Sequence, residues 1–446
     1  MGALSNWVYF WLISMTGRKM KTCFILGEFN VLHPGHLRLF RHVKEYVRRA
    51  FSRFLQTINL SWALPLVFII RALKSWKLIR LGSIRADRIG HFVADACEQK
   101  ARLKNQQPNV IDLFWIPKRT SNAQWRAMIC RELPIARYVK YVDFWNRKLA
   151  GGEAHSRPST YTDSRDMEGF YNRYELGFKF SYEEDRQVRQ WLSSIGFNEG
   201  DEYVCLLVRD SSYLDEQSEL GGGHRDKSKW AYHDYRDSDI ASYEPAIQWL
   251  VNQGIWVFRM GRVMKKPVSL NHPKIVDYAF RTDQSDLLDV WLFAHCKFCI
   301  STSCGPDVIT AIYRSPILYL NASPLGHLTS YWDSLWTPKN LSWEKTGHPL
   351  KLSEYLAHTF FSSDRYREAK ILIKDLSSAE ILEGVQEFWS RKYGVWRETD
   401  EDKFRHKQFW RTFKSWDCYD QFHKWTHPRS DVSTSWLRRQ QEDFFD

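Results

Sequence analysis

Short runs of apolar and β-branched residues alternate with longer, helix-like stretches over most of this chain, and this alternation constrains the fold more than any other feature. Ser181 with Glu184, and Ser285, are expected to cap the helices that follow them. Strands are expected at residues 77–82, 110–116, 202–208, 255–260, 297–301 and 316–320, and helices at 91–103, 121–132, 240–253, 286–295 and 307–314. Such alternation predicts an α/β fold, in which helices cover both faces of a parallel sheet.

The length of 446 residues allows two to three domains, since a domain usually takes about 150 residues. We expect a Rossmann-like domain at residues 75–195 and a second at 196–375. Residues 1–74 are expected to form an N-terminal extension with an apolar helix. Residues 376–446 lack strand patterns and are expected to form a helical C-terminal tail. Residues 151–164 are rich in turn formers and are expected to be a linker or mobile loop.

The chain is basic, with a formal net charge of +12 and an isoelectric point near 9.2. Such a balance favours anionic partners. The Lys and Arg residues are dispersed, and no basic block resembles an arm that binds nucleic acid. Phosphorylated small molecules or lipids are therefore the expected partners, and nucleic acid is not.

The eight cysteines give little indication of a metal site or of a disulfide framework. Cys296 and Cys299 have a zinc-like spacing, but no second Cys or His pair follows at the distance that a zinc site needs. Asp-x-Asp pairs at residues 237–239 and 400–402 are as frequent as chance predicts. We therefore expect no metal, and a reducing cytoplasmic location.

The longest apolar run, Trp62 to Ile70, has nine residues, whereas crossing a bilayer takes about 20. Pro65 interrupts this run and Arg71 ends it. The run either dips into the inner face of a membrane beside neighbouring cations or packs as a buried helix. Peripheral membrane contact is one of the two expectations.

The stretch 301–307 (STSCGPD) is the most informative in the second half of the chain. A strand ends there, hydroxyl groups follow, and Gly305 allows a close backbone approach before the next helix begins. Free amides at a helix start bind phosphate well, although the same pattern also occurs in ordinary strand-to-helix turns. The candidate donor-binding residues of this turn are Ser301, Thr302, Ser303, Gly305 and Asp307.

Arginines follow two other predicted strands. Arg209 comes after strand 202–208, and Arg259 comes just before Gly261, at the end of strand 255–260. Ligands of open α/β sheets bind beyond the carboxyl ends of the strands, where two arginines suit a diphosphate. The alternative interpretation is that each of them is an ordinary surface arginine. His233, Arg236 and Asp237 lie in the loop after Arg209 and are further candidates for the same cleft.

In the first half, residues 83–91 (SIRADRIGH) follow a strand and open a helix. Asp87 or His91 is a candidate general base for an acceptor hydroxyl, and Arg85 and Arg88 are candidates for binding an anionic acceptor. The other interpretation of Asp87 is that it only caps the helix.

Several stretches resemble an uncharacterised family of bacterial glycosyltransferases from surface-polysaccharide clusters. They are LIRLGSIRADRIGHF (78–92), HDYRDSDIASYEPAIQWLVNQG (233–254), WVFRMGRVMKKP (256–267) and DLLDVWLFAHCKFCISTSCGPD (286–307). The resemblance implies a GT-B arrangement, with two facing Rossmann-like domains and the donor nucleotide held mainly by the second. It also implies that no metal or other cofactor is needed.

Residues 26–37 (LGEFNVLHPGHL) resemble the HxGH motif of cytidylyl- and adenylyltransferases. In that motif a glycine and two histidines hold a triphosphate, which implies such a role for His33, Gly35 and His36. The first 75 residues are too few for such a domain, so this stretch is interpreted as a truncated remnant, a fusion scar or the product of a mispredicted gene start.

Together these patterns predict a glycosyltransferase that moves a sugar from a nucleotide-sugar donor to a glycan or lipid-linked acceptor. One alternative is a nucleotidyltransferase that uses the HPGH segment. The other is a non-catalytic protein that binds carbohydrate or membrane through its 21 tryptophans and basic surface.

Overall fold

A computed structural model describes residues 58–157, 159, 165–210 and 231–446, without the side chains of residues 231–233. The chain divides into two compact units, Met1–Trp62 and Ala63–Asp446. The HPGH residues His33, Gly35 and His36 lie outside the described residues. All three sheets of the described residues belong to the second unit, and the domain boundaries at residues 75, 196 and 376 stay predictions.

Residues 58–75 form a helix, with a 3₁₀ turn η1 at Leu73–Ser75. Its length and its mean hydropathy of 1.3 over 18 residues would allow it to cross a membrane, which is weak evidence, since core helices have similar values. Arg71 binds it to the end of helix α5 (Val139–Lys148), where its guanidinium donates to the carbonyl oxygens of Asn146, Leu149 and Ala150 at 2.8 to 3.2 Å. Arg71 is thus engaged within the protein.

The first sheet has three parallel strands in the order β2-β1-β3, and helix α5 packs on β1 and β2. Two of the strands and the helices between them follow the predicted pattern, but β3 lies in the segment expected to be a linker. The bounds are β1 Leu78–Ser83, α3 Ile89–Lys104, β2 Val110–Trp115, α4 Ala123–Glu132, η2 Glu153–His155 and β3 Ser156–Arg157.

The second sheet has seven strands in the order β12-β9-β8-β7-β4-β5-β6, all parallel. Without β12 this is the strand order of the doubly wound Rossmann fold, whose direction reverses between β4 and β7. The mixed α/β fold with parallel sheets is confirmed. The strand bounds are β4 Tyr203–Leu207, β5 Trp256–Arg259, β6 Ile275–Val276, β7 Phe298–Ser301, β8 Ile317–Ala322, β9 Ser334–Pro338 and β12 Asp431–Val432.

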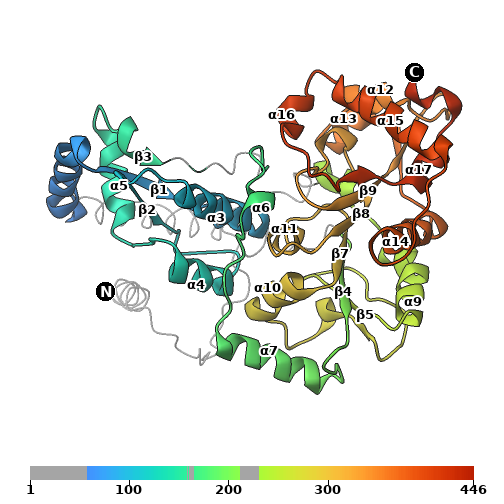
Figure 1. Ribbon diagram of the computed structural model, residues 1–446, viewed down its shortest axis with the longest axis horizontal. Coiled ribbons are helices and arrows are strands. Elements are labelled where there is room, and N and C mark those ends of the chain that lie inside the picture. Colours follow the sequence, from blue (N-terminus) through green and yellow to red (C-terminus); the bar gives the residue numbers. More distant parts are fainter. Residues whose placement is uncertain (1–57, 158, 160–164, 211–230) are drawn as a thin grey trace, which may run out of the picture. The chain divides into compact units, whose positions relative to one another are not determined.

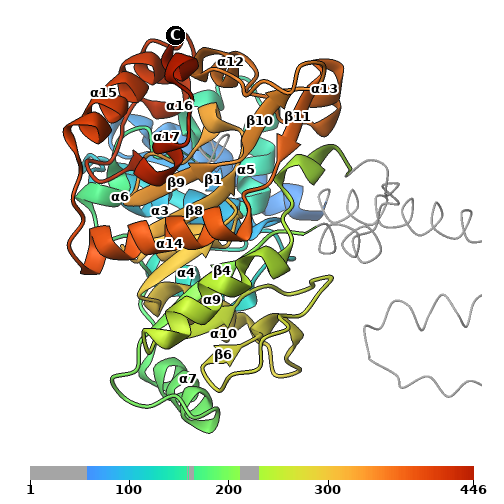
Figure 2. The same ribbon diagram turned by 90° about the vertical axis from the view of Figure 1, so that its right-hand side faces the viewer.

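Helices cover both faces of the second sheet (Figure 1). Helices α9 and α14 pack together on one face, and α10 and α11 pack together on the other (Figures 1 and 2). The cap predicted at Ser285 is present, because its hydroxyl accepts a bond from Leu288 N at 3.1 Å. The bounds are η6 Ile240–Tyr243, α9 Glu244–Asn252, η7 Tyr278–Phe280, α10 Asp286–His295, α11 Asp307–Ile312 and α14 Ser378–Tyr393.

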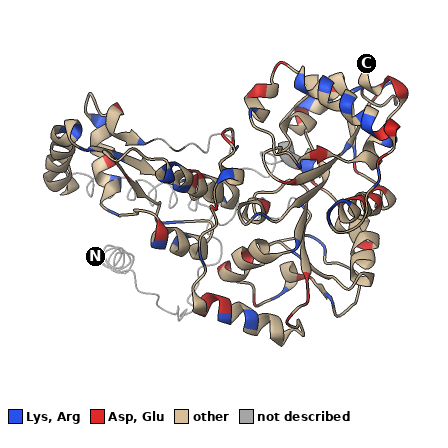
Figure 3. Cartoon of the chain, in the orientation of Figure 1, with Lys and Arg blue, Asp and Glu red and all other residues tan. Residues whose placement is uncertain are grey.

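Strands β9 and β12, which the sequence did not indicate, extend the sheet beyond the predicted strand 316–320. The segment 376–446 is mostly helical but supplies β12. Its two longest helices, Ser378–Tyr393 and Asp400–Lys414, have acidic residues in the first turn and basic residues in the last turn, so both colours occur on each (Figure 3). The remaining bounds are α6 Phe170–Arg173, α7 Tyr182–Ser194, η5 Ala231–Arg236, η8 Leu325–His327, β10 Asn340–Trp343, α12 Leu352–Ala357, α13 Ser363–Glu368, β11 Ile371–Lys374, α15 Asp400–Lys414, α16 Tyr419–His423, α17 Thr434–Arg438 and η9 Glu442–Phe445.

Candidate functional site

The point where the strand order reverses brings together the ends of β4 and β7. Val204 to Leu207 of β4 pair with Phe298 to Ser301 of β7, so both strands end at the same edge. There the hydroxyl of Thr302 accepts a hydrogen bond from Arg209 N at 3.0 Å, and Thr302 N donates to Leu207 O at 3.1 Å. The predicted proximity of Arg209 to the 301–307 turn is therefore present in the structure.

Arg236, in η5, reaches the same turn from the other side. Its guanidinium donates a hydrogen bond to the carbonyl oxygen of Ser303, whose φ of 63° places it in the left-handed region. Arg209, through its main-chain amide, and Arg236, through its guanidinium, thus contact two successive residues of the turn, Thr302 and Ser303. The side chain of His233, in the same 3₁₀ helix, lies outside the described residues.

Asp237 is the acidic residue that contacts Arg209. The sequence indicated only that Asp237 belongs to the loop near the cleft. Its carboxylate accepts a hydrogen bond from Arg209 Nε at 3.1 Å. Burial raises the pKa of Asp237 to about 6, and Arg209 opposes that rise. Asp237 is therefore a carboxylate that can exchange a proton near neutral pH while it orients Arg209.

Lys339 is a site residue that the sequence did not indicate. It follows β9, is only 3% exposed, and donates from Nζ to Asp237 O and to Asp375 Oδ1, both at 2.6 Å. Lys339 therefore connects Asp237, the partner of Arg209, with Asp375. Lys339 directly follows strand β9, just as Arg209 follows strand β4. A strand pattern over β9 would therefore have indicated Lys339 as a candidate.

Asp307 faces the interior of the turn. Its carboxylate accepts bonds from Ser301 Oγ at 2.7 Å and from Cys304 N at 2.9 Å, and burial raises its pKa to about 7. Asp307 and Ser301 are therefore used to shape the turn. Helix α11 has only six residues, so the helix dipole adds little and the arginines supply most of the positive charge at this edge.

Arg259 ends β5 as predicted, but its side chain is only 1% exposed. Its guanidinium donates to Asp277 Oδ1 at 3.1 Å and to Lys266 O at 3.2 Å, and so holds the loop that follows β5. Gly261 begins this loop with a φ of 148°, and a Cβ there would meet the side chain of Met264 at 2.3 Å. A role of Arg259 and Gly261 in donor binding stays a prediction.

Residues 83–91 of the first half adjoin the 301–307 turn. A Cβ on Gly90 would lie 2.8 Å from Gly305 Cα, so the backbones of the two glycines are in direct contact. The contact brings His91, the next residue of α3, to the neighbourhood of the turn. The candidate acceptor and donor segments are therefore adjacent.

The two candidate bases differ in their electrostatics. Asp87 is bound by the guanidinium of Arg85, with Nη2 donating to Oδ2 at 2.9 Å, and this bond lowers the pKa of Asp87. The residue at the N-cap of α3 is Arg88, so the expectation that Asp87 caps the helix is wrong. Burial, followed by the charges of Arg85 and Arg88, lowers the pKa of His91. His91 is therefore neutral at pH 7 and able to accept a proton.

In the part of the chain that the structure describes, no group of three or more His, Cys, Asp or Glu side chains is placed to hold a metal ion. Cys296 and Cys299 are buried thiols within the α/β core.

No protein-family model matches this chain, and no curated protein sequence matches it. Among solved structures it is similar to a glycosyl transferase family 9 protein from Veillonella parvula DSM 2008, with 9% identity over 59% of this chain and 86% of that one, at a TM-score of 0.38. It is also similar to Escherichia coli ADP-heptose LPS heptosyltransferase II, with 12% identity over 55% and 86% of the two chains, at a TM-score of 0.34. A third similar structure is E. coli heptosyltransferase WaaC with ADP, with 12% identity over 58% and 91%, at a TM-score of 0.27. At these values the similarities do not define the activity of this chain.

Proposed function

We propose that the chain is a glycosyltransferase that moves a sugar from a nucleotide-sugar donor to a glycan or lipid-linked acceptor in the synthesis of bacterial surface polysaccharide. The observation that carries this proposal is the convergence of Arg209 and Arg236 on Thr302 and Ser303, at the point where the strand order reverses. This is where doubly wound sheets bind nucleotides. Arginine suits a diphosphate because its planar guanidinium can form two parallel hydrogen bonds.

In the proposed reaction the bond between the sugar and the nucleoside diphosphate breaks, and the acceptor oxygen forms the new bond to the sugar. Negative charge grows on the departing diphosphate, and Arg209 and Arg236 would stabilise it without a metal or other cofactor. His91 is neutral and adjoins the turn, so it is favoured over Asp87 to accept the hydroxyl proton of the acceptor. Arg85 and Arg88 would bind an anionic acceptor.

The GT-B arrangement of two facing domains and a cytoplasmic location, peripheral at the inner membrane face, belong to the same proposal. The nucleotidyltransferase alternative depends on His33, Gly35 and His36, which lie outside the described residues. The non-catalytic alternative, a carbohydrate- or membrane-binding protein, predicts no affinity for nucleotides.

The proposal is tested by thermal shift with UDP, GDP, CDP and ADP, each with Mg²⁺ and with EDTA. One diphosphate should raise the melting temperature in both conditions, since a ligand of the native state stabilises it by mass action. Arg209→Gln and Arg236→Gln should each weaken that binding by about tenfold, the worth of one charge-assisted hydrogen bond. Turnover of the matching nucleotide sugar should then fall in His91→Asn, with binding of the diphosphate unchanged.

The control is Arg186→Gln on helix α7, whose guanidinium pairs with Glu183 at the protein surface. It should bind the diphosphate like the wild type. Wild-type binding by both Arg209→Gln and Arg236→Gln would exclude the donor site. Loss of the shift in EDTA would show that a metal takes part.

A further inference from the structure

A cavity of about 550 Å³ lies at the amino-terminal ends of strands β9 and β12 of the second sheet, away from the candidate donor site. Its walls include Ser334 and Leu335 at the start of β9 and Asp431 at the start of β12. Because the strands are parallel, this edge holds their amino ends, whereas Arg209 and the 301–307 turn lie at their carboxyl ends. The cavity is therefore separate from the proposed glycosyltransferase site.

Four cationic side chains and one carboxylate line this cavity. The cations are Arg391 and Lys392 from the end of α14, Lys414 from the end of α15, and Arg429 from the loop before β12. The carboxylate, Asp431, already accepts a hydrogen bond from Trp410 Nε1 at 2.9 Å and faces His406 Nδ1 at 3.2 Å. The lining is therefore strongly cationic.

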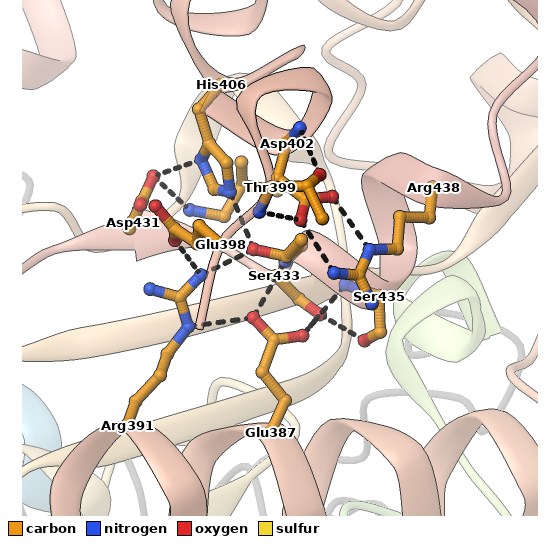
Figure 4. Close-up of polar contacts among 12 residues, drawn as sticks. Glu387, Arg391, Glu398, Thr399, Asp402, His406, Asp431, Ser433, Ser435 and Arg438 are labelled. Atoms are coloured by element: carbon orange, nitrogen blue, oxygen red, sulfur yellow. Dashed lines mark hydrogen bonds and ion pairs between the residues drawn. The ribbon is translucent and has the colours of Figure 1, made fainter. Parts of the chain in front are cut away.

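The carboxylates that accompany these cations are unevenly distributed around the cavity. Arg391 is held between Glu387 and Glu398, as Figure 4 shows. Lys392 and Arg429 share one carboxylate, that of Asp333, which lies 3.0 Å from Arg429 Nη2. Lys414 has no carboxylate within ion-pair distance in the described part of the chain, and its ammonium lies 5.7 Å from the centre of the Trp410 ring. The excess of positive charge is thus local: Lys392, Lys414 and Arg429 face two carboxylates, those of Asp333 and Asp431.

His427 adds a neutral hydrogen-bond donor to the same wall. Its Nδ1 accepts a bond from Arg429 N at 3.1 Å, so the proton of the neutral ring is on Nε2. Burial is the main cause that lowers the pKa of His427, and it keeps the ring uncharged at neutral pH. A neutral donor beside lysine and arginine suits a phosphate oxygen.

The volume and Trp410 indicate more than an inorganic ion. About 550 Å³ is within the range of roughly 300 to 1,000 Å³ that small-molecule sites have in proteins. The half-buried indole of Trp410 is part of the lining and supplies apolar surface there. We propose that this cavity binds a small sugar phosphate, with the phosphate on Lys414, Arg429 and Lys392 and the sugar ring against Trp410.

The site is tested by isothermal titration of the full chain with glucose 6-phosphate, inorganic phosphate and glucose. Glucose 6-phosphate should bind most tightly, inorganic phosphate more weakly, and glucose not at all. The double variant Lys414→Gln/Arg429→Gln should weaken binding of glucose 6-phosphate by about tenfold or more, because it removes two charge-assisted contacts. Both side chains reach solvent, and a melting curve confirms that the variant is folded.

Lys407→Gln is the matched control, because Lys407 is exposed and lies on helix α15, as Lys414 does. This variant should bind glucose 6-phosphate like the wild type. Arg236→Gln distinguishes this site from the proposed donor site. It should leave the binding of glucose 6-phosphate unchanged. Three results would overturn the assignment: no binding to the wild type, equal binding to the double variant, or loss of binding in Arg236→Gln.

Discussion

Asp307 shows how a single carboxyl group can link the shape of the candidate donor turn to pH. It is buried, accepts bonds from Ser301 Oγ and Cys304 N, and has a pKa raised to about 7. In the unfolded chain the same group ionises near pH 4. Between these two values the folded state holds a proton that the unfolded state has lost.

From this difference we predict how stability depends on pH. The contribution of Asp307 to the free energy of unfolding is greatest below pH 4 and is lost as pH rises through about 7. Asp307→Asn removes the titrating group, so the variant lacks this dependence on pH. The free energy of unfolding of the wild type, minus that of the variant, should therefore fall by a few kcal/mol, roughly, between pH 4 and pH 8. Urea unfolding of both proteins across this range measures the effect. Parallel curves would show that Asp307 is ionised throughout.

At the scale of elements, Glu387 on α14 joins the sheet-covering helix to the start of α17. Its carboxylate accepts bonds from Thr434 N and Ser435 N, both at 2.8 Å, and from Ser433 Oγ at 2.7 Å, and it pairs with Arg391 (Figure 4). The side chain is fully buried, and its carboxylate is the acceptor in each of these hydrogen bonds. Helix α17 is therefore anchored by an acid from another helix.

Glu387→Gln should lower the free energy of unfolding by about 3–5 kcal/mol, because it removes one of the two carboxylates that hold Arg391 and places an amide group among hydrogen-bond donors. Glu383→Gln, one turn earlier on α14, is the control. It removes an ion pair with Arg439 whose carboxylate is half-exposed, so it should cost about 1 kcal/mol or less. Chemical denaturation compares the two variants. A similar small loss in both would mean that α17 docks without Glu387.

The sequence predicted most elements of both parallel sheets but missed those with weak patterns. Strands β4, β5 and β7 lie close to their predicted positions, and the capping box of Ser181 and Glu184 is confirmed. Strands β3 and β12 have two residues each, too few for a pattern to emerge. β9 contains Trp336, Thr337 and Pro338, and Pro is a residue that usually argues against a strand.

At the scale of the whole molecule, Gly90 and Gly305 form the contact between α3 and the turn before α11. The Cβ of Gly90→Ala would lie 2.8 Å from Gly305 Cα and 3.0 Å from its carbonyl oxygen. That of Gly305→Ala would lie 3.2 Å from Gly90 N. Gly90→Ala should therefore destabilise the protein by about 1–3 kcal/mol, and more than Gly305→Ala does. Thermal melting of the two variants tests this order, and equal melting temperatures would contradict it.

The candidate site was predictable only in part. Arg209 and residues 301–307 could be brought together from sequence, because both follow strands of one parallel sheet. The sequence did not show that Arg259 is buried against Asp277, because burial depends on the loop that folds over it. Nor did it indicate Lys339, since the strand that positions it was not recognised.

The pairing of β12 with β9 has a consequence for how the protein is made. Translation delivers β9 long before the residues of β12, and Asp431 and Val432 then align with Leu335 and Trp336. Until they arrive, the nascent chain carries β9 as an open edge strand with unpaired amides and carbonyls, a surface on which other chains can assemble. Completion of the sheet is therefore a late event in biosynthesis, and slow or interrupted translation before residue 431 should favour aggregation.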